Sequence, residues 1–148
     1  MMQFRFRLSM LLRLRENLRD ECRQQLAAAQ WAEEIVVARM IELDTEMQGL
    51  RRQTHAASRP GPVDIDRLLN AGRYDMTLRA ERQVAQDQRQ KVVAEIQRRR
   101  EALVEADRDV KILEKLREKQ SARHRYEENI RDVKQLDAVA LRMATTKT

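Results

Sequence analysis

"THAASRPGPVD", residues 54–64, divides a chain that otherwise has the pattern of long helices. The chain has three glycines and two prolines, all between residues 49 and 72, whereas residues 1–48 and 73–148 have none. Inside a helix, a glycine costs about 1 kcal/mol and a proline about 3 kcal/mol relative to alanine. The simplest prediction is therefore two long helices joined by one turn.

We expect a single all-α domain over residues 1–148, with a first helix at about 3–52, a turn at about 53–63 and a second helix at about 64–143. Asp64 is placed to cap the N-terminus of the second helix. The "NAG" stretch at residues 70–72 is typical of a helix end, so the second helix could be interrupted near residues 70–73.

The composition favours a coiled coil over a packed globule. Charged residues make up 36% of the 148 residues and aromatic residues only 3%. The net charge of +6 is compatible with nucleic acid, an anionic membrane surface or an acidic protein as partner, but acidic and basic residues alternate along the chain. Cys22 is the only cysteine, which excludes an intrachain disulfide and fits a reducing compartment.

No segment approaches the roughly 18 continuous apolar residues of a membrane-spanning helix. The N-terminal stretch "MMQFRFRLSMLLRLR" has four arginines and no acid, as targeting peptides do. Arg13 and Arg15 interrupt its apolar run, and no small-residue cleavage site follows. We therefore expect this stretch to begin an amphipathic helix.

Apolar residues recur with a period near 3.5, which is the coiled-coil pattern. The expected inward positions of the first helix are Phe4, Leu8, Leu11, Leu18, Cys22, Ala29 and Val36, with Arg15, Gln25 and Ala32 between them, followed after a one-residue shift by Met40, Leu43, Met47 and Leu50. Those of the second helix are Val92, Ile96, Leu103, Ala106, Val110 and Leu113, with Arg99 between them. The short connection makes the predicted pair antiparallel.

The second predicted helix is longer than the first. At 1.5 Å per residue, the first spans about 75 Å and the second about 110 Å, so residues from about 116 onward have no partner within the chain. Pairs such as Glu127 with Arg131 support this overhanging helix locally, but such pairs seldom hold a lone helix in water. The overhang is therefore expected to fray, to dimerise or to bind another protein.

Few residues could carry chemistry. His55 and His124 have no second ligand at a metal-binding spacing, and no glycine-rich phosphate loop is present, so we expect no metal, no cofactor and no enzymatic activity. The basic run at residues 98–100 lies among glutamates, which favours a solvated face over nucleic-acid binding. Trp31 could fill a gap between the helices or contact a protein. Tyr74 and Leu78 could pack locally or form an exposed anchor.

Three stretches together resemble the flagellar FliJ protein family. They are "FRFRLSMLLRLRENLRDECRQQLAAAQ" at residues 4–30, "ALVEADRDVKILEKLREKQ" at 102–120 and "QLDAVA" at 135–140. The middle stretch matches the family pattern at Leu103, Ala106, Lys111, Leu113, Glu114, Lys115, Leu116, Glu118 and Lys119. In the third stretch, Ala138 stands where a second acid is usual.

The resemblance implies a non-enzymatic, stalk-like component of the flagellar type III protein export apparatus, serving flagellum biogenesis, motility and chemotaxis. Its implied partners are the hexameric export ATPase, which it would regulate, the cytoplasmic domain of the export gate, and export chaperones. Its implied location is the cytoplasm, peripheral to the inner membrane, with no integral membrane segment and no nucleic acid.

The resemblance also suggests which residues make these contacts. Tyr74 and Leu78 fall where the family binds the export gate, although Glu81 and Ala85 stand at the family's later anchor positions. For contact with the ATPase ring we expect two basic clusters at one tip, made of Arg5, Arg7, Arg13 and Arg15 with Lys111, Lys115, Arg117 and Lys119. The alternatives are a generic coiled-coil scaffold that dimerises, or a basic helical protein that binds nucleic acid or anionic membrane.

Overall fold

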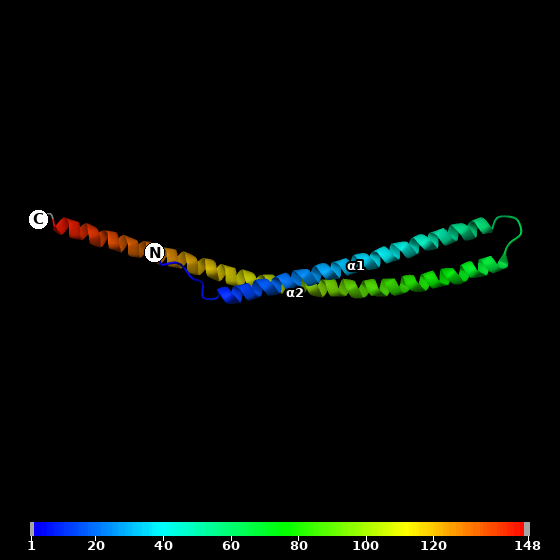
Figure 1. Ribbon diagram of the computed structural model, residues 1–148, viewed down its shortest axis with the longest axis horizontal. Helices are drawn as coiled ribbons and strands as arrows, with labels where there is room; N and C mark the ends of the chain where they lie inside the picture. Colours follow the sequence, from blue (N-terminus) through cyan, green and yellow to red (C-terminus); the bar gives the residue numbers. More distant parts are fainter. Residues whose placement is uncertain (1, 147–148) are drawn as a thin grey trace. The chain divides into compact units, whose positions relative to one another are not determined.

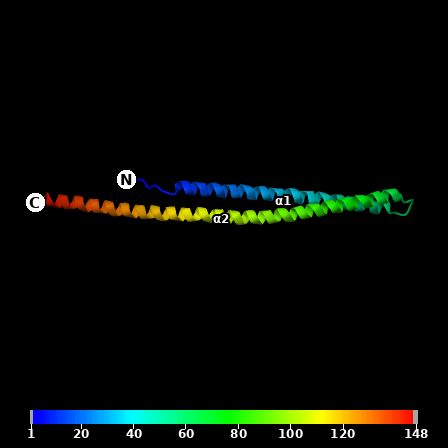
Figure 2. The ribbon, with the colours of Figure 1, turned by 90° about the horizontal axis from the view of Figure 1, so that it is seen from below.

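A computed structural model describes residues 2–146. It contains two helices, α1 (Ser9–Ala57) and α2 (Ile65–Thr145), and the described residues form no strand. The helices run in opposite directions from the turn that joins them (Figure 1, Figure 2). The prediction of an all-α, antiparallel two-helix hairpin with an overhanging second helix is therefore confirmed.

Helix α1 begins at Ser9, six residues later than expected. Residues 2–6 alternate apolar and polar side chains, and a period of two places Phe4 and Phe6 on the same side of an extended chain. Both rings pack against α2, where Phe6 lies in a cluster with Leu12, Val110 and Leu113. This segment lies along α2 without being helical, because extension lets both rings reach the same apolar surface.

The turn is shorter than expected. Helix α1 continues to Ala57, because the first residue that excludes helix is Pro60. At the start of α2, an Oδ1 atom of Asp64 accepts a hydrogen bond from the backbone N–H of Arg67 at 3.2 Å, which confirms the predicted cap.

The predicted break near residues 70–73 is wrong, because α2 is continuous there. Gly72 remains helical, and its cost of about 1 kcal/mol is outweighed where the helix packs on a neighbour. Leu68, Ala71 and Asp75 are the half-buried residues on the side of α2 that faces α1 at this level.

The chain forms two compact units. The terminal unit contains Met1–Glu21 and Val104–Thr148, and the turn unit contains Cys22–Leu103. In the terminal unit, Phe6, Leu12, Val110 and Leu113 form the core, with Phe4 and Leu116 packed against it. In the turn unit, the core consists of Met40, Leu43, Leu78 and Ala85, with Val36, Met47 and Leu50 around it.

The predicted inward positions of α2 are confirmed. Val110 is fully buried, Ile96 and Leu113 are buried, and Val92, Arg99, Leu103 and Ala106 are half-buried.

In the first part of α1, several residues that were predicted to face α2 are exposed instead, so the predicted register is wrong there. Leu8, Leu11 and Leu18 are 38%, 37% and 39% exposed, whereas Leu12, Arg19 and Leu26 lie inward. One unbroken heptad repeat therefore runs from Leu12 to Ala57, with no shift before Met40. Hydrophobicity alone would place Leu18 inward in preference to its neighbour Arg19. Arg19 can take that position because its aliphatic stem covers apolar surface while its charge reaches an acid on α2.

Candidate functional site

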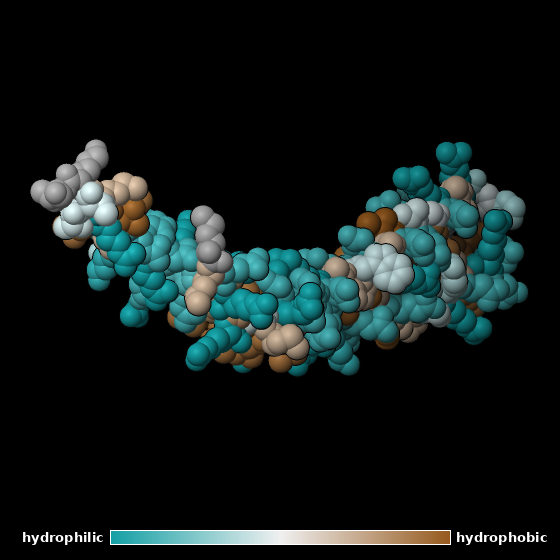
Figure 3. Space-filling model, turned by 60° about the vertical axis from the view of Figure 1, so that its left-hand side comes forward, coloured by the Kyte–Doolittle hydropathy of each residue, from teal (hydrophilic) through white to brown (hydrophobic). Residues whose placement is uncertain are grey.

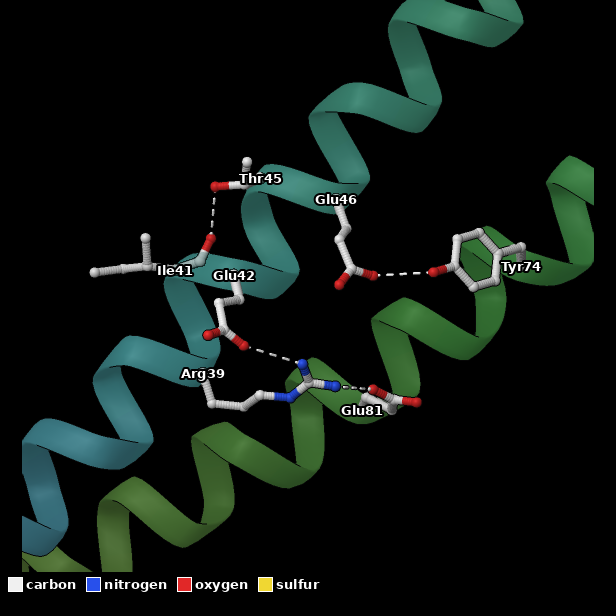
Figure 4. A network of polar contacts seen from close by, with 7 residues as sticks. All are labelled: Arg39, Ile41, Glu42, Thr45, Glu46, Tyr74 and Glu81. Atoms are coloured by element: carbon white, nitrogen blue, oxygen red, sulfur yellow. Dashed lines mark hydrogen bonds and ion pairs between the residues drawn. The ribbon is translucent and has the colours of Figure 1, made fainter.

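Tyr74 lies on the surface of the turn unit and bridges the two helices. Its side chain is 49% exposed, and its hydroxyl donates a hydrogen bond to an Oε2 atom of Glu46 on α1 at 3.0 Å (Figure 4). This hydrogen bond, followed by the negative charge of the same carboxylate, raises the pKa of the Tyr74 phenol. The phenol therefore stays protonated, and its half-exposed ring is open to contact by a partner.

An ion-pair network lies beside Tyr74. Arg39 on α1 donates to Glu81 on α2 at 2.8 Å and to Glu42, one turn along α1, at 3.2 Å (Figure 4). The hydrogen bond to Glu42 is the largest of the effects that raise the pKa of the Arg39 guanidinium. Glu81, where an apolar anchor was expected from the family, is thus held in an ion pair.

Leu78 lies in the interior, one turn from Tyr74. It is only 2% exposed and packs in the core of the turn unit with Met40, Leu43 and Ala85. Of the two alternatives for this pair, local packing holds for Leu78, which is one of the most deeply buried side chains. Tyr74 is left as the member of the pair that faces outward.

The eight basic residues predicted to contact an ATPase all belong to the terminal unit. Arg5, Arg7 and Arg13 are exposed, whereas Arg15 donates to an Oδ2 atom of Asp109 at 3.3 Å. On α2, Lys111 pairs with Asp107 at 2.8 Å, and the remaining three, Lys115, Arg117 and Lys119, are exposed.

These eight residues do not lie at the end of α2, because α2 continues to Thr145. The part of α2 that contacts the N-terminal segment also extends beyond the predicted limit at residue 116. The ring of Phe4 lies against that of His124, with their centroids 5.7 Å apart. The two basic groups form a region at the start of the overhang, called here the basic shoulder.

The sequence reasoning missed a series of polar contacts that arginines of α2 make with α1. In the turn unit, Arg82 binds both carboxylate oxygens of Asp44, at 2.5 and 3.3 Å. Arg89 lies 3.8 Å from Glu33, and Arg99 donates to Gln25 at 2.7 Å. The three arginines occupy heptad positions of α2 that face α1, so a search for acids on the facing positions would have found the pairs made by Arg82 and Arg89.

Arg82 lowers the pKa of the Asp44 carboxyl, first through its hydrogen bond and then through its charge. Such a pair between inward positions also fixes the register, because sliding one helix past the other would leave both charges without their partners.

Other residues singled out in the sequence have ordinary surroundings. Trp31 is 66% exposed and points away from α2, so it fills no gap between the helices. In the basic run, Arg98 and Arg99 both pair with Glu95, at 2.8 and 2.7 Å. Within residues 2–146, no group of three or more metal-ligating side chains comes together, and neither helix is long and apolar enough to cross a membrane.

The family model described as "Flagellar FliJ protein" matches residues 3–148. Comparisons with curated proteins and with solved structures give no match. The family match covers both helices, the turn and the overhang.

Proposed function

Because this chain belongs to the flagellar FliJ protein family, whose members are non-catalytic components of flagellar protein export, we propose that it is a stalk that couples the export ATPase to the export gate. The observation that carries this proposal is the family match over the whole hairpin, together with a second helix that extends beyond its partner. The protein would work in the cytoplasm, at the inner face of the membrane that holds the export apparatus, and would meet export chaperones there.

The hairpin has the properties that a coupling element needs. Within the turn unit, the two helices are paired along an apolar seam and joined by cross-helix ion pairs, which resist bending and sliding of one helix against the other. Charged residues make up 36% of the chain, and a charged surface limits non-specific adhesion to neighbouring proteins.

We assign the ATPase contact to the basic shoulder. Arg5, Arg7 and Arg13, like Lys115 and Arg117, are exposed, so acidic residues at the mouth of a ring could reach their charges. Charges at the rim of an interface mainly affect the association rate and its salt dependence. Arg15 and Lys111 contribute less to this contact, because each already pairs with an aspartate of α2.

The experiment is ATP hydrolysis by the export ATPase, measured against added protein at two salt concentrations. Replacing Arg5, Arg7, Arg13 and Arg15 by glutamine should reduce the stimulation at low salt and flatten its salt dependence. A matched control replaces Arg51, Arg52, Arg59 and Arg67, which are exposed in the turn unit, and removes the same charge far along the sequence. Equal loss of stimulation in both variants would mean that only net charge matters.

We assign the export-gate contact to the surface around Tyr74, with Leu78 supporting it from the interior. Tyr74→Ala removes an exposed ring whose burial against a partner is worth roughly 1.5–3 kcal/mol. It should therefore weaken binding to the cytoplasmic domain of the gate in a titration, while the helicity stays unchanged. Tyr74→Phe separates the ring from the hydroxyl, because it removes only the bond to Glu46. If Tyr74→Ala binds the gate as the parent does, this surface is not the site.

A further inference from the structure

The overhang carries an apolar stripe that no other described residue covers. Its side chains are Ile130, Val133, Leu136, Ala140 and Met143, spaced by three or four residues. The four larger ones are 37%, 56%, 69% and 65% exposed. Apolar side chains are visible at the surface of α2 beside its C-terminal end (Figure 3). These five residues are called here the overhang stripe.

The overhang stripe is not a continuation of the seam between α1 and α2. On α2 that seam passes through Val110 and Leu113 and ends at His124, which lies against Phe4. Val133 follows His124 by nine residues, which is about two and a half turns at 3.6 residues per turn. The stripe therefore faces the opposite side of α2, where a second helix would collide neither with α1 nor with the N-terminal segment.

The charges beside the overhang stripe are self-complementary. At about 100° per residue, Asp137 lies between Val133 and Ile130 around the helix, and Lys134 lies just beyond Ile130. Both charges are therefore on the Ile130 side of the stripe, and Leu136 lies toward the other edge. Neither Lys134 nor Asp137 forms an ion pair within residues 2–146. In an antiparallel pair of identical helices, like edges face each other. A two-fold axis close to residue 136 therefore brings Lys134 of each copy next to Asp137 of the other.

The same two-fold axis also places the apolar side chains of the two copies opposite one another. Leu136 meets Leu136 of the second copy at the axis, Val133 lies about level with Ala140, and Ile130 about level with Met143. A large side chain opposite a small one, at inward positions, is how packed helices interdigitate. A parallel pair is unfavourable. In that arrangement one edge of the stripe faces the opposite edge of the second copy, and Asp132 comes near Asp137 of the other copy.

We propose that the overhang binds a second copy of this chain, antiparallel and about a two-fold axis at Leu136, through the overhang stripe and two Lys134–Asp137 ion pairs. Such an interface is isologous, with one patch used twice. The hairpin itself pairs its helices in this way, with apolar layers and an Arg82–Asp44 ion pair between them. The proposal does not depend on the export function. It means that the overhang must leave its second copy before this stripe can bind another protein.

Sedimentation equilibrium of the full chain, from micromolar to near-millimolar concentrations, tests the proposal directly. The parent should form dimers, and Leu136→Ser should abolish them. Leu69→Ser is the matched control, because Leu69 is 56% exposed on α2 within the turn unit, and it should leave the dimer intact. A parent that remains monomeric throughout, or a dimer that tolerates Leu136→Ser, would overturn the proposal.

The two proposed Lys134–Asp137 ion pairs are tested by reversing one charge and then exchanging both. Lys134→Asp or Asp137→Lys alone converts two attractive pairs into repulsive ones, and loss of two exposed ion pairs weakens association about 3- to 30-fold. The double variant K134D/D137K should recover the dimer. Failure of the double variant to recover it would exclude these ion pairs.

Disulfide trapping distinguishes the two directions. In a Cys22→Ala background, Leu136→Cys places two thiols at the two-fold axis and should give a covalent dimer on oxidation. Val133→Cys should not, because an antiparallel pair sets the two residues 133 apart. Equal cross-linking at both positions would indicate a parallel pair and contradict the proposed arrangement.

Discussion

Substituting Leu78 by alanine tests whether the turn unit is held by its small core. Leu78 is 2% exposed and contacts the cluster of Met40, Leu43 and Ala85. Leu→Ala removes three carbon atoms, each worth about 0.8 kcal/mol when buried, so the transfer loss is about 2.4 kcal/mol. Deletions of this kind cost about 2–5 kcal/mol once the cavity is included. A two-helix pair can close partly around the gap, so we expect about 2–3 kcal/mol.

The corresponding change in thermal midpoint is large. A destabilisation of 1 kcal/mol lowers the midpoint by about 4–8 °C in a domain of 60–100 residues, so Leu78→Ala should lower it by roughly 10–20 °C. Circular dichroism during heating and in urea measures the change. Hydrogen exchange read by mass spectrometry should show the loss of protection in the segments of both helices that surround Leu78.

Leu69→Ala provides the matched control, because it is the same substitution on the same helix at a residue that is 56% exposed. Exposed substitutions of this kind usually change stability by no more than about 0.5 kcal/mol. If the two variants melt within a few degrees of each other, the buried cluster does not hold the turn unit. Propensity and local ion pairs would then have to account for the stability.

Three further predictions follow from particular residues. Gly72→Ala should stabilise α2 by about 0.4–1 kcal/mol, since its added methyl group meets nothing within 4 Å, as urea unfolding would measure. Because the pKa of Asp44 is lowered in the folded state, its pair with Arg82 stabilises the protein above the ordinary aspartate pKa and is lost as the pH falls through the lowered value. Asp44→Asn should therefore reduce the acid sensitivity of the thermal midpoint. Phe6→Ala should increase hydrogen exchange in the segment before α1 without changing the turn unit, because Phe6 packs only in the terminal core.

The sequence was sufficient for the hairpin, because glycine and proline have large local costs that no distant contact needed to override. It was also sufficient for the seam of α2, where Ile96, Val110 and Leu113 are the obvious apolar choices. It was insufficient for the first part of α1. There Leu11 and Leu12 are adjacent, and only the continuity of the repeat with Met40 and Leu43 selects between them.

The surface around Tyr74 was harder to predict for a different reason. A residue four positions away lies on the same side of a helix, but one turn is enough to move a side chain from the edge of a seam into it. Tyr74 and Leu78 illustrate this, since the first is half exposed and the second is buried. The register of α1 against α2 decides between the two environments, and that register depends on contacts such as Arg82 with Asp44.

A helix of 81 residues that pairs with one of 49 residues leaves part of its length unpaired by the shorter helix. The N-terminal segment reduces this unpaired length, because Phe4 and Phe6 extend the seam along α2 in place of a further helical turn. Beyond His124 the overhang stripe lies on the other side of α2, where α1 could not cover it even if it were longer. This change of side is what the proposed antiparallel pairing of two overhangs requires, because it leaves the overhang stripe open to a second copy that approaches from outside the hairpin.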